Sequence, residues 1–284
     1  MVDQIESIPT RTASLPRDLG PRILSSLLLA GVALLFDYAG RGPFAVLVLA
    51  IALLMCWEWG RVVRGEGLDS AFFVQALAVI GAGALSAAGL AAIGLSVLAI
   101  GAILILVMRF GRHARISALG VIYVGLPVVS LLWIRSSEPY GVAAILFLFV
   151  VVWSTDTFAY IGGRLIGGAR LWPSISPNKT WAGLISGVLA STVASALFAL
   201  FIAGASPLAL AASGLILGVV AQAGDLAESA LKRGFGVKDA STLIPGHGGF
   251  MDRLDGVVSV ATAAALMALI ANGQEPARAL LFWS

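Results

Sequence analysis

The stretch S-A-L-K-R-G-F-G-V-K-D-A-S-T-L-I-P-G-H-G-G-F-M-D-R-L-D, residues 229–255, decides the fold and holds most of the chain's unusual chemistry. It gathers two of the three lysines, one of the two histidines and three aspartates in a glycine-rich segment. An apolar run precedes it and another follows it, so its charges must lie at or near a membrane face. Ionisable groups are costly there, and they are functional by default.

Composition fixes the class of the protein. Hydrophobic residues make up 59% of the 284 positions, charged residues only 12%, and the mean hydropathy is +0.98. A soluble domain carries about 25% charged residues. We therefore expect an all-α, polytopic membrane protein. The basic residues lie in short loops, which argues against nucleic acid as a partner, and the single Cys56 excludes a disulfide framework.

Apolar runs long enough to span a bilayer, about 20 residues each, divide the chain. Residues 1–21 are polar and proline-containing, and we interpret them as a flexible cytoplasmic tail. Residues 22–284 are expected to form a single transmembrane domain, with no soluble domain inserted. The nine expected spans lie at 22–38, 43–62, 71–88, 90–108, 116–135, 141–163, 181–202, 206–230 and 256–273.

The charges of the loops orient these nine spans. Alternate loops on one side carry only Arg41, Arg135 and Arg278, and the other fifteen of the eighteen basic residues fall on the opposite side. Cytoplasmic loops are the ones enriched in Lys and Arg. The sequence therefore predicts a cytoplasmic N-terminus, an external C-terminus, and cytoplasmic loops at 164–180 and 231–255.

Two polar clusters precede the opening stretch. Asp156 and Tyr160 are four residues apart at the cytoplasmic end of the sixth span, so they share a helix face. Ile175–Trp181 comes next, and Pro177 disfavours helix at Ser176. A helix that starts after Pro177 would offer backbone N–H groups beside Lys179 and Thr180, which is a natural seat for a phosphate.

The third and largest cluster begins in the eighth span. Asp225, Glu228, Ser229 and Lys232 lie on one helix stripe, and Asp252 and Asp255 open the ninth span. Glycines between them allow the backbone to approach a ligand closely. Four carboxylates with cationic groups nearby suggest a hard divalent cation, because Mg²⁺ is typically held by one or two carboxylates together with substrate phosphates.

Some charged residues, inside and outside these clusters, have a simpler interpretation. Asp37 and Glu58 stand alone near span ends, and we interpret each as a helix cap or as the partner of an arginine. The pair Lys232–Arg233 could serve only as a positive-inside anchor.

The third cluster resembles the signature of the phosphatidate cytidylyltransferases, or CDP-diacylglycerol synthases. That pattern runs from a serine through Lys-Arg and Lys-Asp to His-Gly-Gly and Asp-Arg-x-Asp, and the chain has each of its elements between Ser229 and Asp255. The Asp-Thr-x-Ala-Tyr of 156–160 and the Ser-Pro-x-Lys-Thr-Trp of 176–181 are also similar to the family. The resemblance covers about 150–260, the expected catalytic part.

The resemblance implies that CTP and phosphatidic acid give CDP-diacylglycerol and pyrophosphate at a cell (inner) membrane, with the active site facing the cytoplasm. It places a Mg²⁺ site at Asp225 and Asp252, with Asp255 or Glu228 as a further ligand. A second, monovalent cation and a homodimer are left open. The expected catalytic residues are Asp225, Asp252, Asp255, Lys232 and His247, with His247 contacting phosphate or stabilising the leaving group. The expected substrate-binding residues are Asp156, Tyr160, Ser176, Lys179, Thr180, Ser229, Arg233, Lys238, Asp239, Gly248, Gly249 and Arg253.

The chain departs from the family pattern at Asn178 and Ala182, where the family usually has lysine and glutamate. The missing carboxylate weakens the case for a metal ligand on the seventh span. Two alternatives remain at this point. One is a related membrane transferase or lipid kinase that uses CTP, and the other is an ion-coupled transporter, since broken glycine-rich helices with buried acids also occur in transporters.

Overall fold

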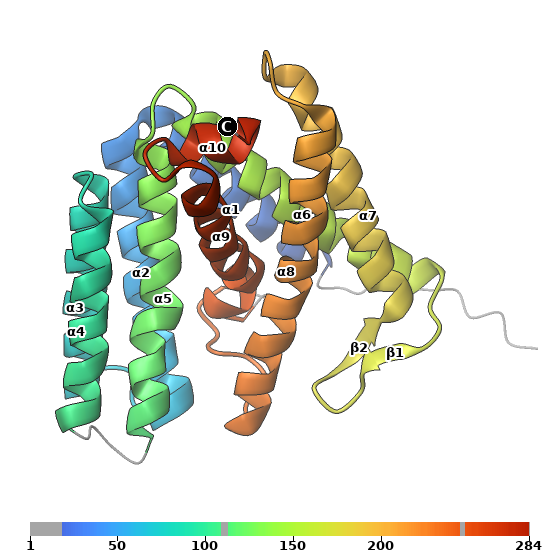
Figure 1. Ribbon diagram of the computed structural model, residues 1–284. Helices are drawn as coiled ribbons and strands as arrows, with labels where there is room; N and C mark the ends of the chain where they lie inside the picture. The colour runs from blue at the N-terminus through green and yellow to red at the C-terminus, as the bar shows by residue number, and fades with distance from the viewer. Residues whose placement is uncertain (1–18, 109–112, 245–247, 284) are drawn as a thin grey trace, which may run out of the picture.

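A computed structural model gives the fold of residues 19–108, 113–244 and 248–283, with side chains described from residue 27 onward. The chain forms a bundle of antiparallel helices with one small hairpin (Figure 1). The helices are α1 (Leu19–Ala39), α2 (Arg41–Arg64), α3 (Ser70–Ala87), α4 (Ala91–Met108), α5 (Ala114–Ser136), α6 (Gly141–Leu165), α7 (Trp181–Phe198), α8 (Pro207–Gly234), α9 (Met251–Asn272) and α10 (Pro276–Phe282). A short 3₁₀ turn, Ala199–Phe201, follows α7.

The helices confirm the expected fold class. In the described part of the chain, eight helices, α2 to α9, are long and apolar enough to cross a membrane, which makes the protein a multi-pass membrane protein. Helix α1 covers the first expected span, but its described apolar part, Leu27–Ala39, is shorter than a bilayer requires. The count of nine spans therefore stays a prediction, as does the cytoplasmic N-terminus.

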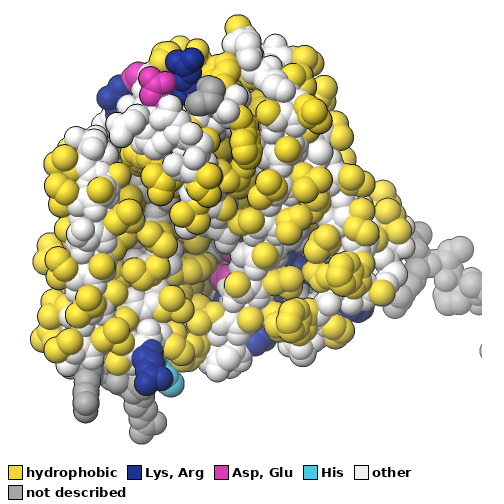
Figure 2. Space-filling view, viewed as in Figure 1, with side chains coloured by type: hydrophobic (Ala, Val, Ile, Leu, Met, Phe, Trp, Pro, Cys, Tyr) yellow, Lys and Arg dark blue, Asp and Glu magenta, His cyan; other side chains and the backbone are white. Residues whose placement is uncertain are grey.

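Figure 2 shows hydrophobic side chains over the flanks of the bundle and charged ones gathered toward its two ends.

Small residues bring α6, α7 and α8 into close contact. A Cβ on Gly183 would lie 2.8 Å from the Ala159 backbone oxygen, and one on Gly187 would lie 2.6 Å from the Thr155 oxygen. Helices in a membrane associate largely through such close packing, because lipid supplies no hydrophobic drive between them. The sequence G-L-I-S-G at the start of α7 therefore sets how tightly α7 packs against α6.

Two short elements were not expected from the sequence. Strands β1 (Arg170–Trp172) and β2 (Ser176–Thr180) form an antiparallel hairpin that protrudes beside α7 (Figure 1), with Arg170 opposite Thr180. The stretch S-P-N-K-T has no apolar alternation, so periodicity could not reveal a strand there. Proline is tolerated in β2 because a two-stranded hairpin has only edge strands. The predicted helix start after Pro177 is confirmed, since α7 begins at Trp181.

A buried ion pair marks the end of the bundle away from the hairpin. Arg135 in α5 donates its Nε–H to Asp37 Oδ1 over 2.5 Å, and its Nη2 donates to the Asp37 carbonyl over 2.8 Å. Asp37 is 0% exposed and Arg135 is 3% exposed. The interpretation of Asp37 as the partner of an arginine is therefore confirmed.

Candidate active site

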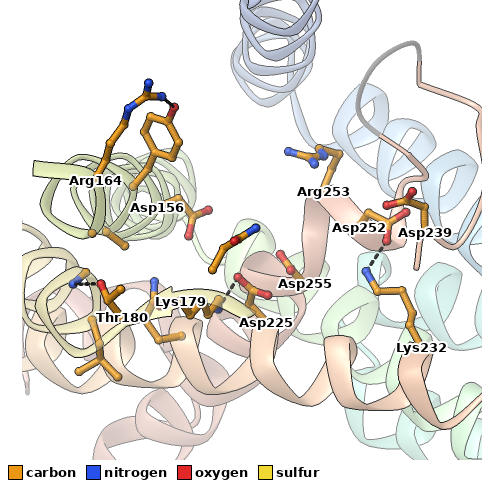
Figure 3. Close-up of a pocket in the computed structure, with 17 residues that line it drawn as sticks. Asp156, Arg164, Lys179, Thr180, Asp225, Lys232, Asp239, Asp252, Arg253 and Asp255 are labelled. Atoms are coloured by element: carbon orange, nitrogen blue, oxygen red, sulfur yellow. Dashed lines mark hydrogen bonds and ion pairs between the residues drawn. The ribbon is translucent and has the colours of Figure 1, made fainter. Parts of the chain in front are cut away.

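A polar cavity of about 730 Å³ opens at the end of the bundle where α6 and α8 finish and where α7 and α9 begin. Figure 3 shows Asp156, Asp225 and Asp255 around one space, with Lys232, Asp239 and Asp252 together at one side of it. The lining residues are Asp156, Ala159, Tyr160, Gly163, Arg164, Asn178, Lys179, Thr180, Gly183, Leu184, Gln222, Asp225, Lys232, Asp239, Asp252, Arg253 and Asp255. Ten of the expected site residues line this one cavity, although they are spread over positions 156 to 255 of the chain.

The hairpin places Lys179 opposite α8. Lys179 Nζ lies 2.5 Å from Asp225 Oδ2, and both side chains are only partly exposed. The next residue, Thr180, caps α7, because its hydroxyl oxygen accepts the Gly183 N–H over 3.1 Å. Helix α7 therefore begins at the cavity wall, with the ammonium of Lys179 directly before it. This arrangement is compatible with the expected phosphate seat.

Lys232 links α8 to α9. Its ammonium lies 2.6 Å from Glu228 Oε2 and also donates to Asp252 Oδ1. The other Asp252 oxygen accepts two backbone N–H groups, from Ala240 over 2.9 Å and from Gly249 over 2.7 Å. Asp252 therefore has a structural function as well as a place in the cavity, because it holds both ends of the loop before α9.

Several carboxylates of the cavity lie where α8 and α9 are in contact. A Cβ on Gly224 would lie 1.9 Å from Ser259 Oγ, so only glycine permits this approach of the two helices. The contact sets Asp225 and Asp255 beside each other at the cavity. Asp156 comes from α6 to the same place, with its Oδ2 4.0 Å from where a Cβ on Gly256 would lie. The Gly256 N–H donates to Asp255 Oδ1 over 2.7 Å.

The donors in the cavity fit a hard cation bound together with phosphate. Among the described residues, no three acidic or histidine side chains come close enough to hold a metal ion by themselves. Carboxylate oxygens of Asp156, Asp225 and Asp255 nevertheless face one space, and Mg²⁺ commonly takes one or two carboxylates plus substrate oxygens. Asp225 would have to exchange Lys179 for the cation.

The other expected site residues lie outside the cavity lining. Glu228 is 1% exposed and pairs with Lys232. The Ser229 hydroxyl donates to Asp225 Oδ1 over 3.4 Å, and Arg233 donates to the Val237 carbonyl over 3.1 Å. The remaining ones are Ser176, which is opposite Trp172 in the hairpin, the exposed Lys238, and Gly248 and Gly249 in the loop before α9. His247 falls outside the described residues.

Three polar residues of the cavity were not expected from the sequence. Arg164 follows Tyr160 by one helical turn and donates to its hydroxyl over 2.8 Å. Gln222 precedes Asp225 by one turn of α8, and Asn178 is one of the two departures from the family pattern. Extending the helix stripes of Asp156 and Asp225 by one turn would have revealed the first two.

Comparisons with known proteins show the family of the chain. Residues 20–271 match the cytidylyltransferase family. The chain is 36% identical to a phosphatidate cytidylyltransferase of Brucella abortus (strain 2308) over 266 residues, which cover 93% of this chain and 98% of that protein. It is 32% identical to one of Bacillus subtilis (strain 168) over 256 residues, 86% of this chain and 95% of that protein. These matches cover the spans before the cavity as well as the cavity itself, and they show that the chain belongs to the cytidylyltransferase family.

Proposed function

We propose that the protein is a phosphatidate cytidylyltransferase, a nucleotidyltransferase of phospholipid biosynthesis. In the reaction, a phosphate oxygen of phosphatidic acid attacks the α-phosphorus of CTP. The bond between the α-phosphorus and the bridging oxygen breaks, and pyrophosphate leaves with the electron pair. The products are CDP-diacylglycerol and pyrophosphate. The observation that carries the proposal is the cavity itself, where cations and carboxylates of four elements meet at one end of a membrane-spanning bundle.

The size and position of the cavity suit two phosphorylated substrates. Its volume of about 730 Å³ falls in the range of small-molecule sites, which is roughly 300–1,000 Å³. Because it opens at the end of the spanning helices, a lipid phosphate could reach it from the headgroup layer while a nucleotide arrives from water. The distribution of basic residues among the loops predicts that this is the cytoplasmic face.

The residues of the chain would act by positioning and by charge. Phosphatidic acid supplies the nucleophile, so the protein must align two polyanions and compensate the charge that develops on the transferring group. Lys179, Lys232 and Arg253 project into the cavity and are suited to bind phosphate oxygens. Arginine offers paired donors that match a phosphate, whereas a lysine acts as a point charge.

Mg²⁺ is the cofactor that we propose, with Asp225 and Asp252 as the first ligands and with Asp255 beside them. When bound, such an ion polarises phosphoryl oxygens and offsets their negative charge. In the structure, each of these carboxylates has another partner: Asp225 has Lys179, Asp252 has Lys232 and two backbone N–H groups, and Asp255 has the Gly256 N–H. A bound monovalent cation and a homodimer stay predictions.

The test uses purified protein in detergent with Mg²⁺, phosphatidic acid and CTP labelled at the α-phosphorus. We expect the label in a lipid product, with release of pyrophosphate. Label that stays in CDP, with γ-phosphate moved to a lipid, would overturn the proposal in favour of a CTP-dependent lipid kinase. The transporter alternative is disfavoured, because the chain belongs to a cytidylyltransferase family.

A further inference from the structure

The start of α9 is capped from a distant helix. Helix α9 begins at Met251, and its N-cap residue Phe250 has no side chain that could accept the free N–H groups of the first turn. Glu58 of α2 accepts them instead, with Oε1 2.9 Å from Phe250 N and Oε2 2.7 Å from Met251 N. A carboxylate is favourable at this end of a helix because it complements the helix dipole. The interpretation of Glu58 as a helix cap is therefore correct, but the helix that it caps is not its own.

Glu58 also holds the preceding loop. Its Oε1 accepts the Ser241 hydroxyl over 2.6 Å, and Glu58 itself is 0% exposed. A Cβ on Gly249 would lie only 2.2 Å from the same Oε1, so the loop backbone is in close contact with this carboxylate. The described loop ends, 240–244 and 248–250, thus lie between Glu58 on one side and Asp252 on the other.

The helix that carries Glu58 is itself firmly packed. The neighbouring Trp59 is 1% exposed and donates its Nε1–H to the Ile116 carbonyl of α5 over 3.1 Å. Its ring lies 5.0 Å from the ring of Tyr123, also in α5. Glu58 therefore connects the α2–α5 part of the bundle to the loop and to the first turns of α9.

The first two turns of α9 carry Asp252, Arg253 and Asp255, all of which line the cavity. We propose that Glu58 is a positioning residue of the active site, which fixes the start of α9 so that these three side chains face the substrates. The inference rests on the proposed function for its catalytic consequence. Glu58 does not line the cavity and touches no reacting group, so it acts only through the backbone that it holds.

The central variant is Glu58→Gln. An amide has one acceptor oxygen and one donor group, so it cannot accept at both positions as the carboxylate does. The matched control is Asp37→Asn, the same chemical change at another fully buried acid, at the opposite end of the bundle. Two measurements are made on the full-length protein: amide hydrogen exchange of residues 248–252, and turnover well below the unfolding temperature of each variant.

We expect Glu58→Gln to speed amide exchange at Phe250 and Met251 and to lower kcat about 10-fold or more, because small displacements of catalytic groups are costly. Asp37→Asn should lose thermal stability, yet keep wild-type exchange at these amides and turnover within about two-fold once folded. Ser241→Ala removes one donor to Glu58 and the acceptor of the Leu243 N–H, but leaves both contacts of Glu58 with the start of α9, so its effect should be smaller.

Wild-type exchange or wild-type turnover in folded Glu58→Gln would overturn the proposal. So would an equal loss of turnover in Asp37→Asn, which would reduce Glu58 to a general stabiliser. If Glu58→Gln does not fold, Ser241→Ala is the deciding variant. Unchanged amide exchange and unchanged turnover in Ser241→Ala would then overturn the proposal. A wild-type protein that makes no CDP-diacylglycerol, with Glu58→Gln still exposing the start of α9, would refute the proposed function but not the positioning of α9.

Discussion

Lys179 Nζ of the hairpin lies 2.5 Å from Asp225 Oδ2 of α8, so a cation of the protein already neutralises a carboxylate expected to bind Mg²⁺. Lys232 does the same for Asp252. A metal ion and a phosphate would have to separate these pairs together, because the ion takes the carboxylate and the phosphate takes the lysine. Metal and nucleotide binding should therefore be coupled.

Lys179→Met tests this coupling. Without the Lys179 ammonium, Asp225 Oδ2 has no cationic partner, so we expect Mn²⁺, used as a probe for Mg²⁺, to bind more tightly in the absence of CTP. The KM for CTP should rise, because a phosphate contact is lost. Electron paramagnetic resonance measures free Mn²⁺, and steady-state kinetics give KM. The control is Arg278→Met, an exposed basic residue in α10 that is not among the expected site residues, and it should change neither value much. Equal Mn²⁺ affinity in wild type and Lys179→Met would contradict the coupling.

Asp225→Asn and Asp252→Asn should each lower kcat at least ~100-fold, which corresponds to about 3 kcal/mol, because charge on the transferring group is then uncompensated. The two variants should differ in stability. Asp252 also accepts two backbone N–H groups and pairs with Lys232, so only its variant should unfold at a clearly lower temperature. The measurements are kcat across a Mg²⁺ titration and thermal unfolding in detergent. Near-normal turnover in folded Asp225→Asn would remove that residue from the metal site.

Gly224→Ala should separate α8 from α9. The new methyl group would meet Ser259 Oγ at 1.9 Å and Ser259 Cβ at 2.6 Å, so rotation of the serine cannot relieve the clash. Overpacking of this kind costs about 1–3 kcal/mol, and we expect a loss of turnover as Asp225 and Asp255 move apart. Thermal unfolding and kcat are measured together.

Two further variants make the Gly224 test specific. Gly234→Ala in the same helix meets no atom within 4 Å, so it should be harmless. Ser259→Gly removes the clashing side chain and should restore activity to Gly224→Ala. Failure of this rescue would show that the helix contact is not the cause.

Thr242→Cys and Gln274→Cys test the orientation of α9, because both positions are exposed and they lie beyond its opposite ends. The native Cys56 is 0% exposed and should not react with a membrane-impermeant maleimide. In intact cells only Gln274→Cys should be labelled, while inside-out vesicles should label only Thr242→Cys. Labelling of both residues from the same side would refute the predicted topology.

Sequence reasoning found most of the cavity because its chemistry is local. Asp225 and Lys232 lie on one face of a helix, and Asp252 and Asp255 open the next apolar run. Because a charged side chain is energetically costly in a membrane, these residues could be identified as functional from the sequence. Arg164 and Gln222 extend the same stripes by one turn and could have been included.

By itself, the sequence determined the class of the protein, the helices α2 to α9, and the region where the charges gather. Hydrophobic length and the cost of buried charge are properties of the chain that need no coordinates. Only the tertiary structure decided which partner each charge has. Glu58 looked like an isolated acid, yet it lies against Ser241 and Met251, 183 and 193 residues further along the chain. No helical or strand period can encode a contact of that separation, because it depends on how α2, α5 and α9 pack together.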